Sequence, residues 1–405
     1  MALLFPFRAV RPAPGVAAAV AAVPYDVVNT EEARQLASDA PLSFLHVSRA
    51  EIDLPPSTDP YAPIVYETAG RNYARLKTSA PLVVEDAPSL YFYRLRMGRH
   101  VQTGVAGAFS LDDYDADVIV KHEKTRKDKE DDRTRHIVDL RAQTGPVFLT
   151  YPEAPVVEGV AARVVSGEPL YDFTASDGVE HAIWRVPPAE AEELVTAFDG
   201  IPRLYIADGH HRAASAARAR AALRGTGRER QEYDAFLAVA FPDSQVQILS
   251  YNRLVADLGG RRPGELLEAL SATHGVTPGP AIPTRKGDVA MFLAGHWYTV
   301  TLQSPPHGAG PGDGLDVAQV QEQILGPLLG IGDQRTDKRI DFVGGGRGPG
   351  ALEQAVGSGR AAVAFSMFPV SVADLMAVSD AGEIMPPKST WFEPKLRDGL
   401  LIHEI

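Results

Sequence analysis

One stretch near the middle of the chain, RLYIADGHHRAAS at positions 203–215, constrains the fold most strongly. The apolar run 204–207 is typical of a short buried strand, and the alanine-rich run 213–223 is typical of a helix. Gly209 stands between them, and glycine accepts the left-handed backbone that a sharp turn requires. A strand, a glycine turn and a helix in this order predict a mixed α and β structure in which free helix amides face outward.

The polar residues of this turn indicate a site for anions. Unpaired amides at a helix start attract negative charge. Asp208 adds a carboxylate that can bind a metal ion, His210 and His211 are possible proton carriers, and Arg212 offers a planar fork for a phosphate group. The alternative is a solvated turn in which Asp208 caps the helix.

Composition limits the classes of protein that the chain can belong to. Its 405 residues suggest two or three domains of roughly 100–200 residues each, and 45% hydrophobic with 23% charged residues is typical of a soluble globular protein. No stretch approaches the roughly 18 consecutive apolar residues of a membrane helix, so we expect a cytoplasmic protein without a membrane partner. The absence of cysteine excludes disulfides and thiolate chemistry. A net charge of −12 makes nucleic acid an unlikely partner but allows a local basic pocket.

Two clusters in the first half of the chain add candidate groups. KHEKT at 121–125 follows a predicted strand end at 118–120 and precedes a very polar run that extends to residue 142. That run predicts either a solvated helix with ion pairs four residues apart or an exposed lid. Upstream, residues 90–111 predict a hairpin closed at Gly98 and Arg99. Asp26, in VPYDVV, is either a site carboxylate or a turn aspartate.

The C-terminal segment forms a third cluster. Lys388, Ser389, Thr390 and Lys395 place two cations and two hydroxyls around Trp391, which suits a phosphate or a nucleotide base edge. The alternative is an extended arm that packs Trp391 into a groove. The glycine-rich run 344–350 also follows a predicted strand, but no acidic residue stands about 20 positions further on, so nicotinamide binding is disfavoured.

Five motifs in a fixed order carry a resemblance to a known family. PFRAVRP, VPYDVV, KHEKT, LYIADGHHR and MPPKSTWFEPK follow one another over nearly the full length. In this order they resemble domain of unknown function 1015, a family of uncharacterised bacterial and archaeal proteins. The resemblance predicts family membership and implies no activity.

The ADGHHR turn is also similar to the phosphate-binding turn of the ParB and sulfiredoxin superfamily. Sulfiredoxin has a cysteine in its turn, and this chain has none. ParB proteins add a basic DNA-binding segment, which a charge of −12 argues against. Free serine kinases need an aspartate, a glycine and a histidine at the turn with a separate glutamate base, and Glu123 can supply that base.

These features together predict a kinase that transfers a phosphoryl group from ATP or ADP, with Mg²⁺, to free L-serine or a related small alcohol. The predicted catalytic residues are Glu123, Asp208 and His210, with His210 also a possible phosphate donor. The predicted nucleotide and phosphate ligands are Gly209, His211, Arg212, His122, Thr125, Arg126, Lys388, Ser389 and Thr390. Asp26 and Lys395 are predicted to bind the substrate, and Asp208 the metal ion.

Two other functions stay open. One is a switch protein that closes on ATP or CTP without turnover, and the other is a metal-dependent phosphohydrolase. Neighbours at a helix start, such as His210 and His211, point about 100° apart and cannot easily share a metal ion, which disfavours the hydrolase. A homodimer is compatible with any of these functions.

We predict an α+β fold in three segments. Residues 1–150 form an N-terminal α/β region, residues 151–258 a ParB-like core around 200–225, and residues 259–405 a C-terminal α/β lobe with a closing arm. Residues 208–212 are expected to line the largest polar cleft and to share a site with His122 and Glu123.

Overall fold

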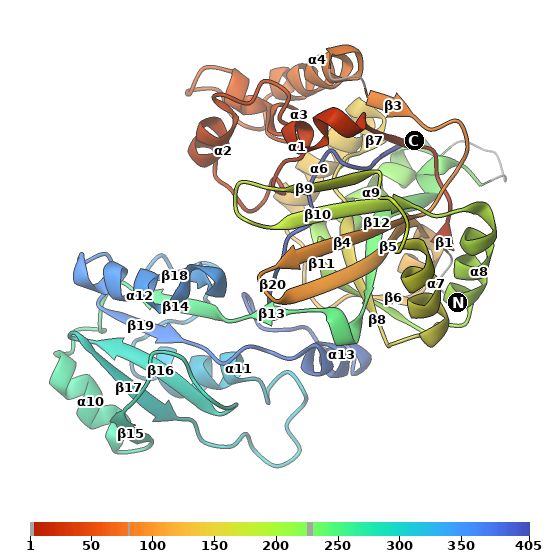
Figure 1. Ribbon diagram of the computed structural model, residues 1–405. Coiled ribbons are helices and arrows are strands. Elements are labelled where there is room, and N and C mark those ends of the chain that lie inside the picture. Colours follow the sequence, from red (N-terminus) through yellow and green to blue (C-terminus); the bar gives the residue numbers. More distant parts are fainter. Residues whose placement is uncertain (1–3, 80–81, 225–229) are drawn as a thin grey trace. The chain divides into compact units, whose positions relative to one another are not determined.

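The computed structural model describes residues 4–79, 82–224 and 230–405. Its fold is α+β, with helices and mixed sheets, as predicted. The chain divides into two compact units (Figure 1). The first unit comprises Met1–Val246 with Pro394–Ile405, and the second comprises Gln247–Glu393.

The three predicted segments differ from these two units. Strands from both sides of residue 150 pair in one sheet, so the first two segments share a core. The second unit begins at Gln247 rather than at residue 259, and the last twelve residues return to the first unit.

Nine strands of the described chain form the main sheet of the first unit, in the order β6-β11-β8-β12-β5-β4-β10-β9, with β1 beside β5. Their bounds are β1 (Leu4–Phe5), β4 (Tyr91–Met97), β5 (His100–Ser110), β6 (Ile119–Val120), β8 (Val147–Tyr151), β9 (Tyr171–Thr174), β10 (Glu180–Arg185), β11 (Leu204–Asp208) and β12 (Ala235–Pro242). β4 and β5 form the predicted hairpin, with Met97 opposite His100 and Gly98 at φ 59°. β11 pairs parallel with β6 and antiparallel with β8, so the end of β11 and the end of β6 lie together.

Helices of the first unit form two groups: residues of the first four belong to a separate hydrophobic core, and residues of the last five pack against the main sheet. They are α1 (Ala17–Val20), α2 (Thr30–Ala37), α3 (Leu45–Ser48), α4 (Pro63–Ser79), α5 (Leu111–Asp115), α6 (Lys127–Leu140), α7 (Pro155–Val164), α8 (Pro188–Asp199) and α9 (His210–Leu223). Figure 1 shows α7 and α8 side by side. Phe198 of α8 packs against Phe109 of β5, with ring centroids 5.9 Å apart. Burying a side chain of this size contributes about 1.5–3 kcal/mol, which holds these helices to the sheet.

The polar run after KHEKT folds into α6, which is only partly a solvated helix. Ion pairs four residues apart lie on its outer face, including Lys127–Asp131 at 2.9 Å and Arg135–Asp139 at 3.3 Å, as predicted. Its inner face packs on α9 and α4 and buries polar residues, among them Asp132 and His136. The alternative of an exposed lid is therefore wrong for this segment, because one face of the helix is buried.

The C-terminal arm (residues 394–405) completes a second sheet of the first unit. In the described residues its order is β3 (Leu82–Val84), β2 (Ala9–Pro12), β21 (Ile402–Glu404) and β7 (Ala142–Gln143). β21 lies between β2 and β7, and Tyr73 of α4 donates a hydrogen bond to Glu404 (2.9 Å). Arg397 donates to the buried His181 at 3.2 Å. The arm is thus an integral part of the core rather than a peripheral extension.

The second unit is described without gaps and has its own six-stranded sheet. The order is β15 (Gly275–Pro278), β17 (His296–Thr301), β16 (Asp288–Leu293), β19 (Val363–Ser366), β14 (Tyr251–Val255) and β18 (Ile340–Gly344). Its α-helices are α10 (Pro263–Ser271), α11 (Asp316–Val320), α12 (Gly348–Gly357) and α13 (Val372–Asp380). The chain enters and leaves this unit through the paired strands β13 (Ile248–Leu249) and β20 (Trp391–Phe392).

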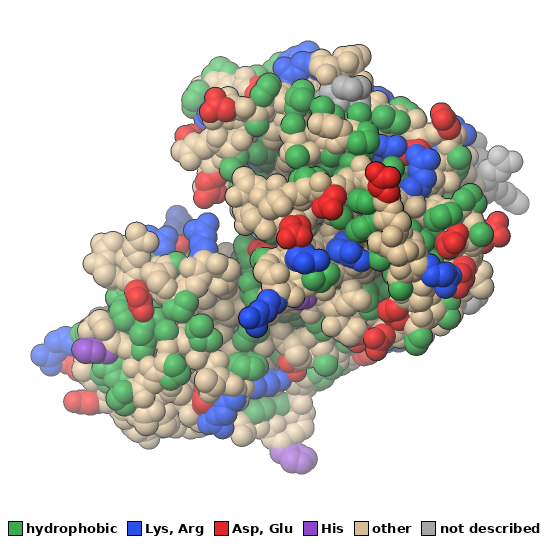
Figure 2. Space-filling view, viewed as in Figure 1, with side chains coloured by type: hydrophobic (Ala, Val, Ile, Leu, Met, Phe, Trp, Pro, Cys, Tyr) green, Lys and Arg blue, Asp and Glu red, His purple; other side chains and the backbone are tan. Residues whose placement is uncertain are grey.

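The surface carries both signs of charge. Figure 2 shows Lys and Arg side chains interspersed with Asp and Glu side chains over the visible face. Within the described ranges, no helix combines the length and the apolar character needed to span a bilayer.

Candidate functional site

The ADGHHR turn has the predicted strand, glycine and helix, and its helix starts three residues earlier than expected. β11 ends at Asp208, Gly209 adopts φ 96° and ψ 29°, and α9 begins at His210. Gly209 is the N-cap, and no side chain caps the helix, so the alternative reading of Asp208 as the cap is wrong. A Cβ atom on Gly209 would lie 3.0 Å from Nε of Arg212. Glycine is therefore required both by the backbone angle and by the guanidinium folded against it.

Asp208 lies between two cations. Its Oδ2 accepts a hydrogen bond from Nζ of Lys395 at 3.0 Å and lies 3.5 Å from Nη2 of Arg212. Burial opposes ionisation of this carboxyl, but the two cations outweigh it and hold the pKa of Asp208 well below its usual range. Asp208 is therefore an ionised anchor that fixes Lys395 and Arg212.

His122 and His210 form a buried pair that links β6 to α9. The backbone amide of His122 donates to Nε2 of His210 at 3.4 Å, and the two rings meet edge to face with centroids 4.3 Å apart. Nδ1 of His210 lies 3.9 Å from Oε2 of Glu123. Since Nε2 accepts, the proton of a neutral His210 belongs on Nδ1, where it faces Glu123. This arrangement brings His122, Glu123 and the turn together, as the sequence predicts.

Both imidazoles are neutral at pH 7. Burial lowers the pKa of His122 to about 4 and that of His210 well below its usual range. Nε2 of His210 is turned inward to a backbone amide, so the prediction that this residue donates a phosphoryl group does not fit its geometry. His210 is instead placed to orient the carboxylate of Glu123.

A pocket of about 290 Å³ opens beside His210 and Glu123. This outer pocket is lined by Tyr114, Lys121, Glu123, Lys124, Thr125 and His210. Half of the Glu123 side chain (53%) is exposed there. Lys121 lies over the ring of Tyr114, 4.2 Å from its centroid, and forms an ion pair with Asp117 at 2.6 Å. The outer pocket therefore combines one carboxylate, two ammonium groups, two hydroxyl groups and an imidazole at a helix start.

The site prediction omitted Lys121, Lys124 and Tyr114. A signal for the two lysines was present, because they flank Glu123 in KHEKT. Tyr114 had no such signal, since its place at the pocket depends on how α5 packs.

Three predicted phosphate ligands have other contacts. Nε2 of His211 accepts a hydrogen bond from the backbone amide of Arg126 at 3.0 Å, which joins α9 to the start of α6. The Arg126 side chain forms an ion pair with Asp128 at 2.8 Å. Thr125 lines the outer pocket, but its hydroxyl donates to Glu130. Of these three residues, only Thr125 lies at the outer pocket.

Arg212 lies on the other side of the turn. Its side chain is 9% exposed, Nη1 donates to the carbonyl of Pro146, and Nη2 lies 3.9 Å from Oδ2 of Asp26. It lines a small inner cavity of about 40 Å³ rather than the outer pocket. A cleft of about 580 Å³ in the second unit, lined by residues such as Arg261 and Arg339, is larger than either. The prediction that the whole turn lines the largest polar cleft is therefore wrong.

The third cluster is divided between the two units. Lys395 belongs to the first unit, at Asp208. Lys388, Ser389 and Thr390 belong to the second unit, where Nζ of Lys388 lies 5.5 Å from the ring centroid of Tyr251 and Ser389 donates to the carbonyl of Pro386 at 2.6 Å. Their predicted role in the nucleotide site stays a prediction.

The donors around Asp208 do not fit a magnesium ion. Mg²⁺ is usually held by one or two carboxylates and substrate phosphates in near-octahedral geometry, and Asp208 is already bound by Lys395 and faced by Arg212. In the part of the chain that the structure describes, no three histidine, aspartate or glutamate residues cluster so as to hold a metal ion.

A model of the family described as "Protein of unknown function (DUF1015)" matches residues 4–320. The chain belongs to this family. The DUF1015 match includes the outer pocket and the ADGHHR turn, whereas Lys395 and Asp398 lie beyond it. Among curated proteins, none matches the chain.

This DUF1015 protein is weakly similar to several solved structures. SbnI from Staphylococcus aureus, with a C-terminal truncation, has a TM-score of 0.38 and 14% identity, over 72% of this chain and 85% of that one. A free serine kinase in complex with AMP has a TM-score of 0.34 and 14% identity, over 73% and 92%. A conserved hypothetical protein from Pyrococcus furiosus has a TM-score of 0.34 and 15% identity, over 74% and 94%. Because these TM-scores are low, the function must be argued from the site itself.

Proposed function

We propose that the protein is a nucleotide-dependent kinase that phosphorylates a small alcohol at the outer pocket, with ATP or ADP as the donor. One observation carries the proposal: Glu123 lies between two lysines at a helix start, beside an imidazole. Phosphoryl transfer requires mainly positioning and neutralisation of phosphate charge, with a carboxylate to receive or orient the proton of the hydroxyl. The outer pocket offers these groups in about 290 Å³.

Each group has a distinct role in this proposal. Lys121 and Lys124 bind phosphate oxygens, with the backbone amides at the start of α9. Glu123 receives the proton of the acceptor hydroxyl, and Nδ1–H of His210, at 3.9 Å, orients it. Asp208 and Lys395 hold the turn in place through their ion pair.

Magnesium enters this proposal with the nucleotide. When bound to nucleotide phosphates, Mg²⁺ neutralises part of their charge. Asp208 is occupied by Lys395 and Glu123 serves as the base, so the phosphates of the nucleotide would themselves hold this ion. Free L-serine is the proposed acceptor, and the distant kinship of the turn with the ParB and sulfiredoxin superfamily belongs to the same proposal.

The first experiment measures nucleotide binding. Thermal unfolding is followed with ATP, ADP and CTP, each with and without Mg²⁺. A nucleotide at 100 times its dissociation constant stabilises the fold by about 2.7 kcal/mol. Absence of any shift with all three would contradict the nucleotide site.

The second experiment tests the base. Glu123→Gln keeps the shape of the side chain and removes its charge, so formation of phosphoserine, measured by mass spectrometry, is expected to fall by about 10² or more. Nucleotide binding is expected to persist in this variant. Glu168→Gln, at an exposed position of the same unit, is the matched control and is expected to leave turnover unchanged.

The outcomes separate the alternatives. Equal turnover in both variants would show that Glu123 is not the base. Wild-type protein that binds nucleotide but phosphorylates neither serine nor any related alcohol would instead support a nucleotide-dependent switch.

A further inference from the structure

The inner cavity lies beneath the ADGHHR turn and has no part in the proposed reaction. Its lining includes Tyr25, Ser48, Arg133, His136, Arg212 and Asp398. Its volume of about 40 Å³ exceeds the roughly 10–15 Å³ that a single water molecule requires. The walls come from α3, α6, α9, β7 and the C-terminal arm, all in the first unit.

Donors at this cavity lack acceptors. Arg212 is nine-tenths buried, yet its Nε and Nη2 make no hydrogen bond, and Nη2 has only the distant carboxylates of Asp208 and Asp26. Oγ of Ser48 is buried and also has no hydrogen-bond partner. Leaving a buried donor unsatisfied costs about 1–3 kcal/mol, and more when it is charged. A bound molecule that accepts hydrogen bonds from these donors would remove this cost.

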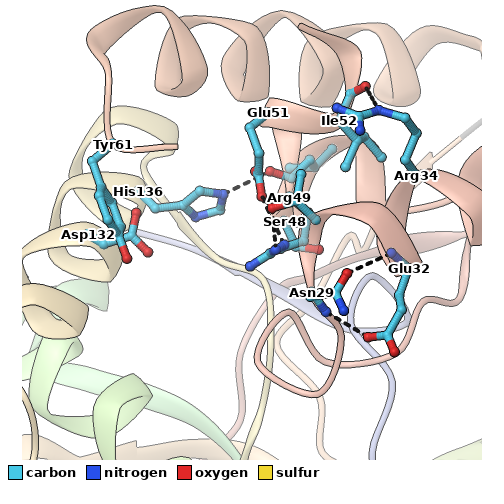
Figure 3. A network of polar contacts seen from close by, with 12 residues as sticks. Asn29, Glu32, Arg34, Ser48, Arg49, Glu51, Ile52, Tyr61, Asp132 and His136 are labelled. Atoms are coloured by element: carbon cyan, nitrogen blue, oxygen red, sulfur yellow. Dashed lines mark hydrogen bonds and ion pairs between the residues drawn. The ribbon is translucent and has the colours of Figure 1, made fainter. Parts of the chain in front are cut away.

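Arg133, the second guanidinium of the lining, is held by its own contacts. Nε of Arg133 forms an ion pair with Asp132 at 2.8 Å, and Nη1 donates to the carbonyl of Ser48 at 3.1 Å. Figure 3 shows His136 reaching from α6 to α3, where its Nε2 donates to the carbonyl of Val47 at 3.0 Å. These contacts fix α3 to α6, so the position of Ser48 does not depend on an occupant.

The charge of the lining favours an anion over water alone. The lining itself contains two guanidinium groups, of Arg133 and Arg212, and one carboxyl group, that of Asp398. The other carboxylates near these guanidinium groups, those of Asp132, Asp208 and Asp26, lie outside the lining. A Cβ atom on Gly145 would lie 2.5 Å from Oδ1 of Asp398, so this glycine leaves room for the carboxyl beside the cavity. A carboxylate with two acceptor oxygens matches the unpaired N–H groups of a guanidinium.

We propose that the inner cavity binds the carboxylate group of a small organic acid, through Arg212 and Ser48, with Asp398 beside it in the lining. This inference is independent of nucleotide turnover, because it concerns the opposite side of the turn.

Binding at this site depends on pH through one group. Burial raises the pKa of Asp398 to about 7, against the opposing effect of Arg212, and the nearby Asp26 raises it further. Of the other titratable groups that face it, Tyr25 has a raised pKa, burial lowers the pKa of His136 to about 4, and Arg133 and Arg212 stay charged. Loss of the proton from Asp398 above pH 7 adds a negative charge, so the anion is expected to bind more weakly at high pH.

Calorimetric titration of the full chain with sodium formate, without nucleotide, tests the proposal. Sodium chloride at equal ionic strength is the reference. The expected result is saturable formate binding that weakens from pH 6 to pH 8, by up to about tenfold for the loss of one proton from a group of pKa about 7. Asp398→Asn removes the titrating group and is expected to abolish this pH dependence.

A second variant, at Ser48, tests the proposal even if the Asp398 variant fails to fold. Ser48→Ala removes a hydroxyl that makes no hydrogen bond in the fold, and it is expected to weaken formate binding several-fold without changing its pH profile. Ser79→Ala, at an exposed serine, is the control. Absence of saturable formate binding at any pH, equal binding of chloride, or identical affinity in the Ser48 and Ser79 variants would each overturn the proposal.

Discussion

At the scale of single residues, Gly209 carries two constraints at once. Its φ of 96° is a conformation that side chains with a Cβ atom rarely adopt, and its Cα faces the guanidinium of Arg212. The sequence allowed the first constraint to be predicted, since a glycine between a strand and a helix is typical of a left-handed turn. It gave no sign of the second, because the direction of the Arg212 side chain depends on Pro146 and Asp208.

Gly209→Ala separates these constraints when compared with Gly178→Ala. Gly178 also has positive φ, at 81°, but a Cβ atom there would meet nothing within 4 Å. A strained backbone costs about 1–3 kcal/mol, so both variants are expected to lose stability in urea unfolding. The loss is expected to be larger at Gly209, where Arg212 must also move. Equal losses would mean that the contact with Arg212 contributes nothing.

The same scale explains which site residues the sequence could identify. His122 and Glu123 come shortly after the end of β6, and Asp208 is the last residue of β11. Because β6 and β11 pair side by side, the proximity of these residues could be predicted. The burial of Arg212 could not be predicted, because a charged residue at a helix start is usually exposed.

At the scale of elements, α6 shows what periodicity reveals and what it hides. Its outer ion pairs were predictable from spacing. Its inner face buries Asp132 and His136 among apolar residues. Their burial could not be predicted, because a polar residue in a sequence does not indicate whether its side chain belongs to a buried hydrogen-bond network. Tyr66 donates to Asp132 at 2.8 Å, and Asp132 in turn pairs with Arg133.

Asp132→Asn is expected to be far more damaging than Asp139→Asn on the same helix. The first change leaves the buried guanidinium of Arg133 without its counter-charge, which costs about 3–5 kcal/mol. The second breaks an exposed pair with Arg135, which is worth about 0–1 kcal/mol. Urea unfolding of both variants measures the difference. Similar losses would show that the Asp132 pair does not stabilise the core.

At the scale of the whole molecule, the second unit is an insertion within the first. The amide of Glu393 donates to the carbonyl of Gln247 at 3.2 Å, so the two ends of this unit are held together by their own backbone. The sequence predicted a separate C-terminal lobe but placed its start at residue 259. It missed the return of the chain, because the last strand, β21, has only three residues.

Replacing residues 247–393 with a short glycine-rich linker is therefore expected to leave the first unit folded. Its sheets, the outer pocket and the inner cavity all draw on residues outside that range. Circular dichroism and a cooperative thermal transition measure folding, and formate titration tests the inner cavity. A shortened chain that does not fold would show that the first unit depends on the second.

The position of β21 also imposes an order on folding. This strand lies between β2 and β7, and its Glu404 joins a tyrosine 331 positions earlier in the chain. Closing so long a loop adds little free-energy cost, about 0.6 kcal/mol for each doubling of length, but contacts of such high sequence separation form slowly. We therefore expect β21 to dock late in folding. Lys395 lies on the same C-terminal arm, so its ion pair with Asp208 is expected to form at that stage, after the core that supports the candidate site.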